Sequence, residues 1–155
     1  MKKILFAFYV LAALLFGAKN GTYKALPYDS TLSLLRSVSH DAIILGTGRQ
    51  NVHVFIDPLC PHSRKFVSMV VGQQAMLSKY RFHFYLYSIP RLHSEAAVLA
   101  VYLSDDAAGI LIDIMVHQAA IPPVRVGNEV AQVRQVASVA EQIGVFKRPF
   151  LFVER

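Results

Sequence analysis

Short apolar runs separated by polar turns divide this chain into predicted strands and helices. Three segments have the short apolar or alternating pattern of strands, namely residues 42–45, 52–56 and 80–88. The third of these, YRFHFYLYS, alternates along its length and is rich in aromatic residues. Apolar positions at helical spacing predict helices over residues 31–38, 60–79, 95–103 and 106–118, and from after Asn128 to about Ile143.

Turn and cap residues define the ends of these elements. Ser30 is expected to cap the first helix, Gly72 to kink the second, and Gly144 to end the last. Pro122 and Pro123 break the chain between the last two helices. The helix that begins at Cys60 is expected to contact the core through four apolar residues: Phe66, Met69, Val70 and Leu77.

The composition fits one folded domain preceded by an apolar segment. The chain has 155 residues, of which 54% are hydrophobic and 17% charged, so it can bury a core and is not expected to be disordered. Lys2 and Lys3 precede an apolar run, Ile4 to Ala18, which is shorter than the roughly 20 residues of a membrane span. We therefore expect residues 1–18 to be a secretory signal peptide, or an N-terminal anchor if uncleaved, and residues 19–155 to form the domain.

The charge and the histidines exclude several classes of function. The net charge is +6, but the lysines and arginines are scattered and form no basic stripe with interleaved aromatic residues, so nucleic-acid binding is not expected. No cysteine–histidine cluster has ligand spacing, so no metal is expected, and we predict no cofactor. His53 and His83 lie within predicted strands and are interpreted as core or face residues.

The single cysteine lies where a predicted buried strand meets a helix. The sequence VHVFIDPLCPHSRKF gives a strand, a turn at residues 57–59, and then Cys60 opening the helix. Unpaired backbone N–H groups and the helix dipole stabilise an anion at this point, and the thiolate is the reactive form of cysteine. Pro61 suits the first helical position, and His62, when charged, adds a second stabilising influence.

These residues also have plain structural interpretations. A lone cysteine is usually a small buried hydrophobe, but its place before a proline at a strand-to-helix turn favours an exposed thiol at Cys60 that is functional or was formerly functional. His62 is either a solvated residue of the helix N-terminus or a residue that tunes Cys60. Asp57 is either a turn former or a group that takes part in proton transfer.

The strand, acidic turn and C-P-x-x sequence resemble the thioredoxin-fold catalytic domain of bacterial periplasmic disulfide isomerases of the DsbC/DsbG kind. The middle pair, Pro61-His62, is similar to that of the oxidase DsbA. Thioredoxin-fold enzymes also place a cis-proline opposite the active cysteine, and Pro149 matches that position, with Arg148 where threonine is usual. The resemblance covers about residues 30–155 and implies a thioredoxin-like α/β fold with a helical insertion in a periplasmic protein.

Only residues 150–155 follow Pro149 in this sequence. We therefore expect the fold to lack the last edge strand and the C-terminal helix of a complete thioredoxin core. The sheet edge is then either open or covered. Since exposed edges are usually protected, the N-terminal strand or a partner could cover it.

The resemblance implies thiol–disulfide chemistry with one sulfur. Ser63 occupies the position of the family's second cysteine, so the chain cannot store an intramolecular disulfide. Cys60 can still attack a substrate disulfide and be released by the substrate's own thiol, as in isomerisation, or by a small thiol such as glutathione. Ser63 can hydrogen-bond the thiolate. Pro149 and Arg148 are expected to bind the substrate, and the charge of Arg148 to favour acidic partners.

Two classes of function therefore remain open. The first is a periplasmic monothiol isomerase or reductase that acts on exported cysteine-containing proteins or small thiols, with Cys60, His62 and Ser63 as its catalytic residues. The second is a redox-inactive thioredoxin-like module that binds exported polypeptides or belongs to an envelope assembly. If residues 1–18 remain uncleaved, either protein would be anchored to the inner membrane.

Overall fold

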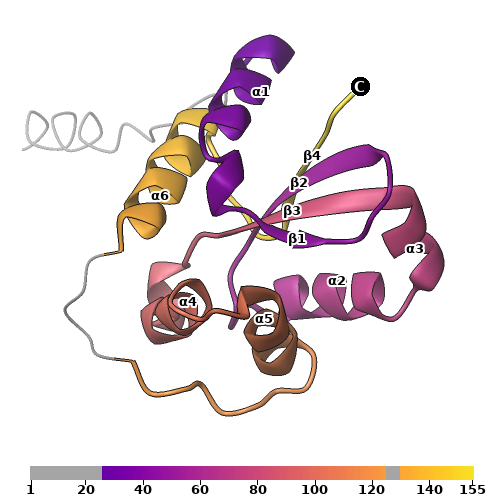
Figure 1. Cartoon of the computed structure of the whole chain (residues 1–155). Helices are drawn as coiled ribbons and strands as arrows, with labels where there is room; N and C mark the ends of the chain where they lie inside the picture. Colours follow the sequence, from indigo (N-terminus) through magenta and orange to yellow (C-terminus); the bar gives the residue numbers. More distant parts are fainter. Residues whose placement is uncertain (1–25, 125–129) are drawn as a thin grey trace, which may run out of the picture.

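The computed structural model describes residues 26–124 and 130–155 (Figure 1). The predicted signal peptide and Asn128 lie outside these residues. In chain order the elements are α1 (Tyr28–Ser37), η1 (Ser39–Asp41), β1 (Ile43–Leu45), β2 (Gln50–Ile56), α2 (Pro61–Val71), α3 (Gln74–Lys79), β3 (Tyr80–Leu86), η2 (Pro90–Leu92), α4 (Glu95–Tyr102), α5 (Ala107–Met115), α6 (Ala131–Ile143) and β4 (Phe150–Val153).

The four strands form one mixed sheet in the order β1-β3-β2-β4. The two central strands, β2 and β3, run parallel, with Val54 opposite Phe84. The outer strands run antiparallel to their neighbours: β1 pairs with β3, and β4 pairs with β2 so that Leu151 lies opposite Val54. Among the described residues, no strand pairs with the outer edge of β4.

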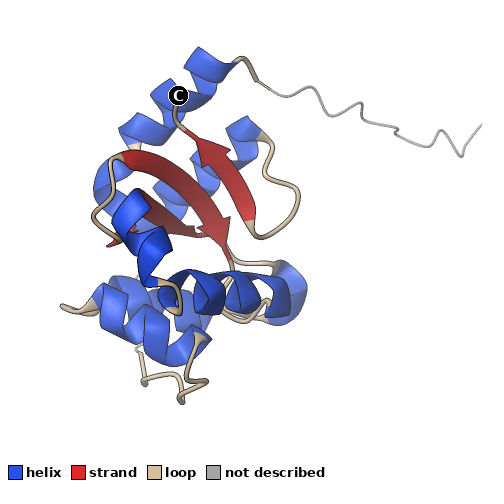
Figure 2. Ribbon diagram, turned by 90° about the vertical axis from the view of Figure 1, so that its right-hand side faces the viewer, coloured by secondary structure: helices blue, strands red, loops and turns tan. Residues whose placement is uncertain are grey.

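Helices cover both faces of this sheet, and each face has its own core (Figures 1 and 2). On one face, α1 and α6 pack over Phe55 and Tyr85. On the other face, α2, α4 and α5 pack over Val54, Phe84 and Leu86. This arrangement follows from the alternation of side chains along a strand, because β2 and β3 are apolar on both faces where they are covered. Within residues 26–124 and 130–155, no helix is long and apolar enough to span a membrane.

The turn between β1 and β2 is fixed against the end of α3. The Thr47 N–H donates to the Leu77 carbonyl at 2.8 Å and the Gly48 N–H to the Tyr80 carbonyl at 3.2 Å. A Cβ at Gly48 would overlap the backbone of Lys79, so the chains approach this closely only because the residue is glycine. The contact fixes the start of β2 relative to the end of α3 and the start of β3.

The predicted strands and helices are confirmed, with corrections at several positions. The helix predicted over residues 60–79 is interrupted at Gly72, where α2 ends and α3 follows as a separate helix. Met69 is 41% exposed, so its prediction as a core contact was wrong; Val70 is buried as predicted, and Val67 is the buried residue of α2 that was missed. The first helix begins at Tyr28, before Ser30, because Pro27 takes the N-cap position. Gly144 ends α6 in the left-handed conformation, at φ 80°, as predicted.

Candidate functional site

Cys60 lies at the junction that the sequence predicted, between β2 and α2. It is the N-cap residue of α2, with Pro61 at the first helical position and the Cys60 carbonyl accepting the Arg64 N–H at 2.9 Å. The residue is only 5% exposed, so the prediction of an exposed thiol was wrong. The reason is a neighbouring loop: the Cys60 thiol donates to the Arg148 carbonyl oxygen, with an Sγ···O distance of 3.8 Å.

The loop that covers the thiol, residues 144–149, leads from α6 into β4. Its Arg148–Pro149 peptide bond is cis, the isomer that the family resemblance implies. The structure therefore brings Pro149, Arg148 and Cys60 together, although Arg148 and Cys60 are 88 residues apart in the sequence.

The Arg148 side chain is bound to a third segment, the loop after β3, residues 87–94. Its Nε donates to the Tyr87 carbonyl and its Nη2 to the Ser88 carbonyl, both at 2.9 Å. The guanidinium also stacks on the Tyr87 ring, with Cζ 3.9 Å from the ring centroid. Arg148 would have to give up these contacts to pair with an acidic partner, so its expected preference for acidic or thiolate-rich partners stays a prediction.

The two other predicted catalytic residues, Ser63 and His62, lie in different environments: Ser63 is buried and His62 is exposed. Ser63 is fully buried and its Oγ accepts the Asp57 N–H at 3.3 Å. No hydrogen bond joins Ser63 to the Cys60 thiol in the described part of the chain, and the capacity of Ser63 to hydrogen-bond the thiolate stays a prediction. His62 is exposed on the first turn of α2.

Asp57 is the residue whose importance the sequence analysis underestimated. Its carboxylate is fully buried and accepts four hydrogen bonds. Oδ1 accepts the N–H groups of Leu59 at 2.8 Å and Cys60 at 3.1 Å. Oδ2 accepts the Ile89 N–H at 2.5 Å and the Ser94 hydroxyl at 2.6 Å.

These four bonds give Asp57 two structural roles. The Oδ1 bonds form the local Asx turn that the D-P-L-C sequence predicts. The Oδ2 bonds tie this turn to the loop after β3, and no sequence pattern could identify partners 32 and 37 residues away. Four donors satisfy a buried carboxylate without any cation, so the geometry favours an anchor of the Cys60 turn.

No group of three histidine, cysteine, aspartate or glutamate residues is placed to hold a metal ion within the described ranges. His53, predicted as a core residue, is 2% exposed, and its ring nitrogens contact Tyr85 Oη at 3.0 Å and Glu154 Oε1 at 2.9 Å.

With this geometry established, comparison with solved structures defines the fold. The chain is similar to Helicobacter pylori DsbG, with a TM-score of 0.60 and 15% identity over 81% of this chain, and it spans 61% of the length of that protein. It is also similar to the disulfide interchange protein of Neisseria gonorrhoeae, with a TM-score of 0.54 and 22% identity over 74% of this chain and 84% of that one.

A third similar structure is the catalytic domain of Proteus mirabilis ScsC, with a TM-score of 0.56 and 11% identity over 82% of this chain and 86% of that domain. No protein-family model and no curated protein matches the sequence. The chain thus has the thioredoxin-like fold found in DsbG and in other thiol–disulfide exchange proteins, as predicted.

Proposed function

We propose that this protein carries out thiol–disulfide exchange through Cys60 after export to the periplasm, acting as a monothiol isomerase or reductase. The observation that carries the proposal is the contact of the Cys60 thiol, at the N-terminus of α2, with the carbonyl of Arg148, the residue before Pro149. The proposal is further supported by the fold, which is that of thiol–disulfide exchange proteins.

The proposed exchange begins when Cys60 loses its proton and its hydrogen bond to the Arg148 carbonyl. The thiolate then attacks one sulfur of a substrate disulfide, forming a mixed disulfide with Cys60 and releasing the other substrate sulfur as a thiolate, which takes up a proton. The first amides of α2 and its dipole stabilise the attacking anion.

The second half of the exchange needs a thiol from outside the chain, because the sequence has a single cysteine. If another thiolate of the same substrate attacks the captured sulfur, Cys60 leaves as a thiolate and the substrate disulfide is rearranged without net electron transfer. If two small thiols such as glutathione react in turn, Cys60 is released, the substrate is reduced and the small thiols become a disulfide. Exported proteins with cysteines are the substrates of both routes.

A redox-inactive binding module is the second candidate. It is favoured by the burial of Cys60 and by the use of Ser63 as an acceptor for a backbone N–H group. In that case the surface around Pro149 would bind an extended polypeptide or an envelope partner without covalent capture.

The two candidates differ in whether covalent adducts form. Exported protein is trapped with acid, alkylated and run on non-reducing gels. The wild type should show higher-mass adducts that collapse on reduction, Cys60→Ser should show none, and Ser63→Cys should show fewer because a second thiol can release the captured sulfur. If the wild type forms no adduct with protein or glutathione while Cys60→Ser keeps full cellular function, the binding module is the correct candidate.

A further inference from the structure

The hydrogen bonds around Cys60 form a closed ring that joins three loops. From the Cys60 N–H the ring passes to Asp57 Oδ1, and from Asp57 Oδ2 to the Ile89 N–H. One residue earlier, the Ser88 carbonyl accepts Arg148 Nη2, and the Arg148 carbonyl accepts the Cys60 thiol. The ring therefore begins and ends at the proposed nucleophile.

Two charged side chains, Asp57 and Arg148, both bind the loop after β3. Asp57 binds the Ile89 N–H and the Ser94 hydroxyl, while Arg148 binds the carbonyls of Tyr87 and Ser88. Asp57 accepts only and arginine donates only, so the two side chains recognise opposite groups of the same short segment.

The ring has one element that only arginine supplies. The planar guanidinium of Arg148 donates two hydrogen bonds to two successive carbonyls. The same plane stacks on the Tyr87 ring, with Cζ 3.9 Å from the ring centroid. A lysine would keep the charge but lacks both the fork and the flat face. Lys147, the adjacent residue of the same loop, is exposed and has its Nζ over the exposed Phe146 ring. It offers a matched cation outside the ring.

We infer that Arg148 is a positioning residue for exchange with polypeptide disulfides, because its guanidinium fixes the loop before Pro149 to the loop after β3 and so sets where a substrate backbone meets Cys60. This inference rests on the proposed function and identifies the residue that positions the substrate for it. The role depends on the shape of the guanidinium, whereas its charge alone contributes little.

The test compares Arg148→Lys with Lys147→Gln on the full chain. The first readout is the rate of exchange between Cys60 and a model peptide disulfide, set against the rate of alkylation by iodoacetamide. Arg148→Lys should slow peptide exchange by about 10- to 100-fold, since small displacements of a positioning group have effects of this size. It should not slow alkylation, because iodoacetamide needs no peptide-binding surface. Lys147→Gln should leave both rates within about twofold of wild type, as expected for an exposed residue.

Hydrogen exchange separates positioning from a general loss of stability. Opening of the ring should speed exchange of the Ile89 amide in Arg148→Lys, while the amides of β1 keep their wild-type protection. Tyr87→Leu gives a second measure, because it removes the stacked ring but leaves both carbonyl acceptors. It should slow peptide exchange by about threefold, in line with the loss of one cation–π contact.

Two results would overturn the inference. In one, Arg148→Lys exchanges with the peptide as fast as wild type; in the other, β1 loses protection as much as Ile89 does. A wild type that does not react with the peptide disulfide, although iodoacetamide alkylates it, would instead refute the proposed function and this inference with it.

Discussion

Two polar clusters lie on β2, one directly after its C-terminal end and one around Asn51 and His53 in its N-terminal half (the far end), and they are built on different principles. At the thiol end, Asp57 is satisfied by three backbone N–H groups and one serine hydroxyl. In the N-terminal half of β2, His53 is bonded to Glu154, and Asn51 donates to the same carboxylate at 3.1 Å. His83 stacks on His53 with its ring centroid 4.7 Å away.

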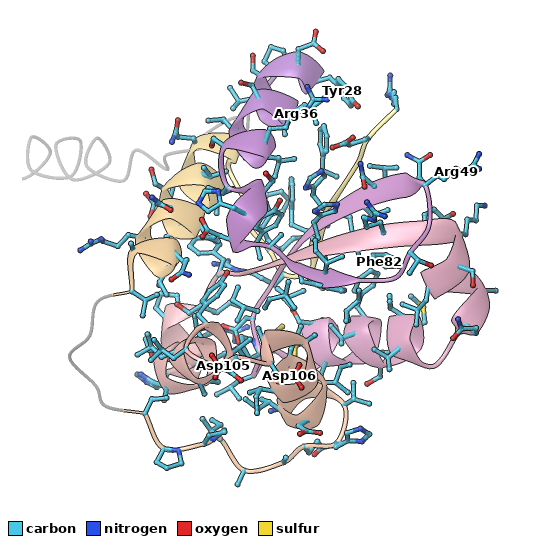
Figure 3. The ribbon with its side chains drawn as sticks, viewed as in Figure 1. Tyr28, Arg36, Arg49, Phe82, Asp105 and Asp106 are labelled. Atoms are coloured by element: carbon cyan, nitrogen blue, oxygen red, sulfur yellow. The ribbon has the colours of Figure 1, made fainter. Side chains whose placement is uncertain are left out.

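The clusters also join different parts of the fold. The Asp57 cluster ties loops together around Cys60, whereas the His53 cluster ties β2 to β3 and β4 across the sheet. Tyr28, labelled on α1 in Figure 3, stacks on Phe152 with ring centroids 5.0 Å apart and so links α1 to β4. The difference teaches that the buried Asp57 carboxylate is satisfied by neutral donors, while the far cluster contains His83 and Glu154, whose pKa values are both lowered.

The pKa values of His83 and Glu154 in the far cluster are both lowered. Burial, aided by the nearby His53, lowers the pKa of His83 from 6.5 to about 4. Burial alone would raise the pKa of Glu154, but hydrogen bonds from His53 and Asn51 outweigh it and lower that pKa. Burial also raises the pKa of Tyr85, so its hydroxyl, which lies 3.0 Å from His53 Nδ1, stays protonated.

The largest expected effect comes from Asp57→Ala, which leaves buried N–H groups without acceptors. We expect it to lower the free energy of unfolding by about 3 kcal/mol or more, because several unsatisfied donors each carry a desolvation cost. At the other end of β2, Glu154→Gln keeps an acceptor for His53 and should cost only about 1 kcal/mol. Urea denaturation measures both values.

The comparison also predicts a difference at the thiol. In the folded state Asp57→Ala should speed iodoacetamide alkylation of Cys60, since the turn that holds it is released, whereas Glu154→Gln should leave the alkylation rate unchanged. Equal effects of the two substitutions on alkylation would show that the clusters are not independent.

Sequence reasoning succeeded where the relevant contacts are local. The period of apolar residues located β2 and β3, and the D-P-L-C-P run predicted the turn and the helix N-terminus at Cys60. It failed where a partner lies far along the chain. The burial of Cys60 depends on Arg148, and the bonds of Arg148 depend on main-chain carbonyls of another loop, which no residue type encodes.

The same limit explains the missed role of Asp57, whereas the contact of Ser63 is a local one, six residues away. A serine in a C-x-x-S motif suggests a contact with the sulfur, but the turn directs its hydroxyl toward the Asp57 N–H. Asp57 was recognisable as a turn former, yet its bonds to Ile89 and Ser94 appear only in three dimensions.

A smaller effect should appear in acid. The unfolded chain protonates His83 near pH 6.5 and the folded chain only near pH 4, so between these values the unfolded state binds more protons. Stability from this group is therefore fully present above pH 6.5 and is lost as pH falls toward 4, and Glu154 adds a loss as pH falls through its lowered pKa.

Urea midpoints across this pH range test the assignment. His83→Phe keeps the stacked ring but removes the titration, so it should flatten the acid side of the profile. The difference should be at most about 1 kcal/mol, because His83 is partly exposed and solvent screens its charge. An unchanged slope in His83→Phe would assign the acid sensitivity to other groups.

The smallest effect is expected at His62. This residue is exposed on the first turn of α2, and solvent screens any charge that it carries, whereas the backbone amides at the start of α2 remain in place whatever the side chain. His62→Ala should therefore lower the rate of Cys60 alkylation near pH 6 by only about two- to fivefold, the effect of one exposed charge near a helix end. Iodoacetamide rates measured from acid to alkaline pH provide the test, with the exposed His117 as a matched control in His117→Ala. A loss far larger than this, absent from His117→Ala, would mean that His62 and not the helix N-terminus makes Cys60 reactive, and the thiol end would then depend on a titratable side chain as the far end of β2 does.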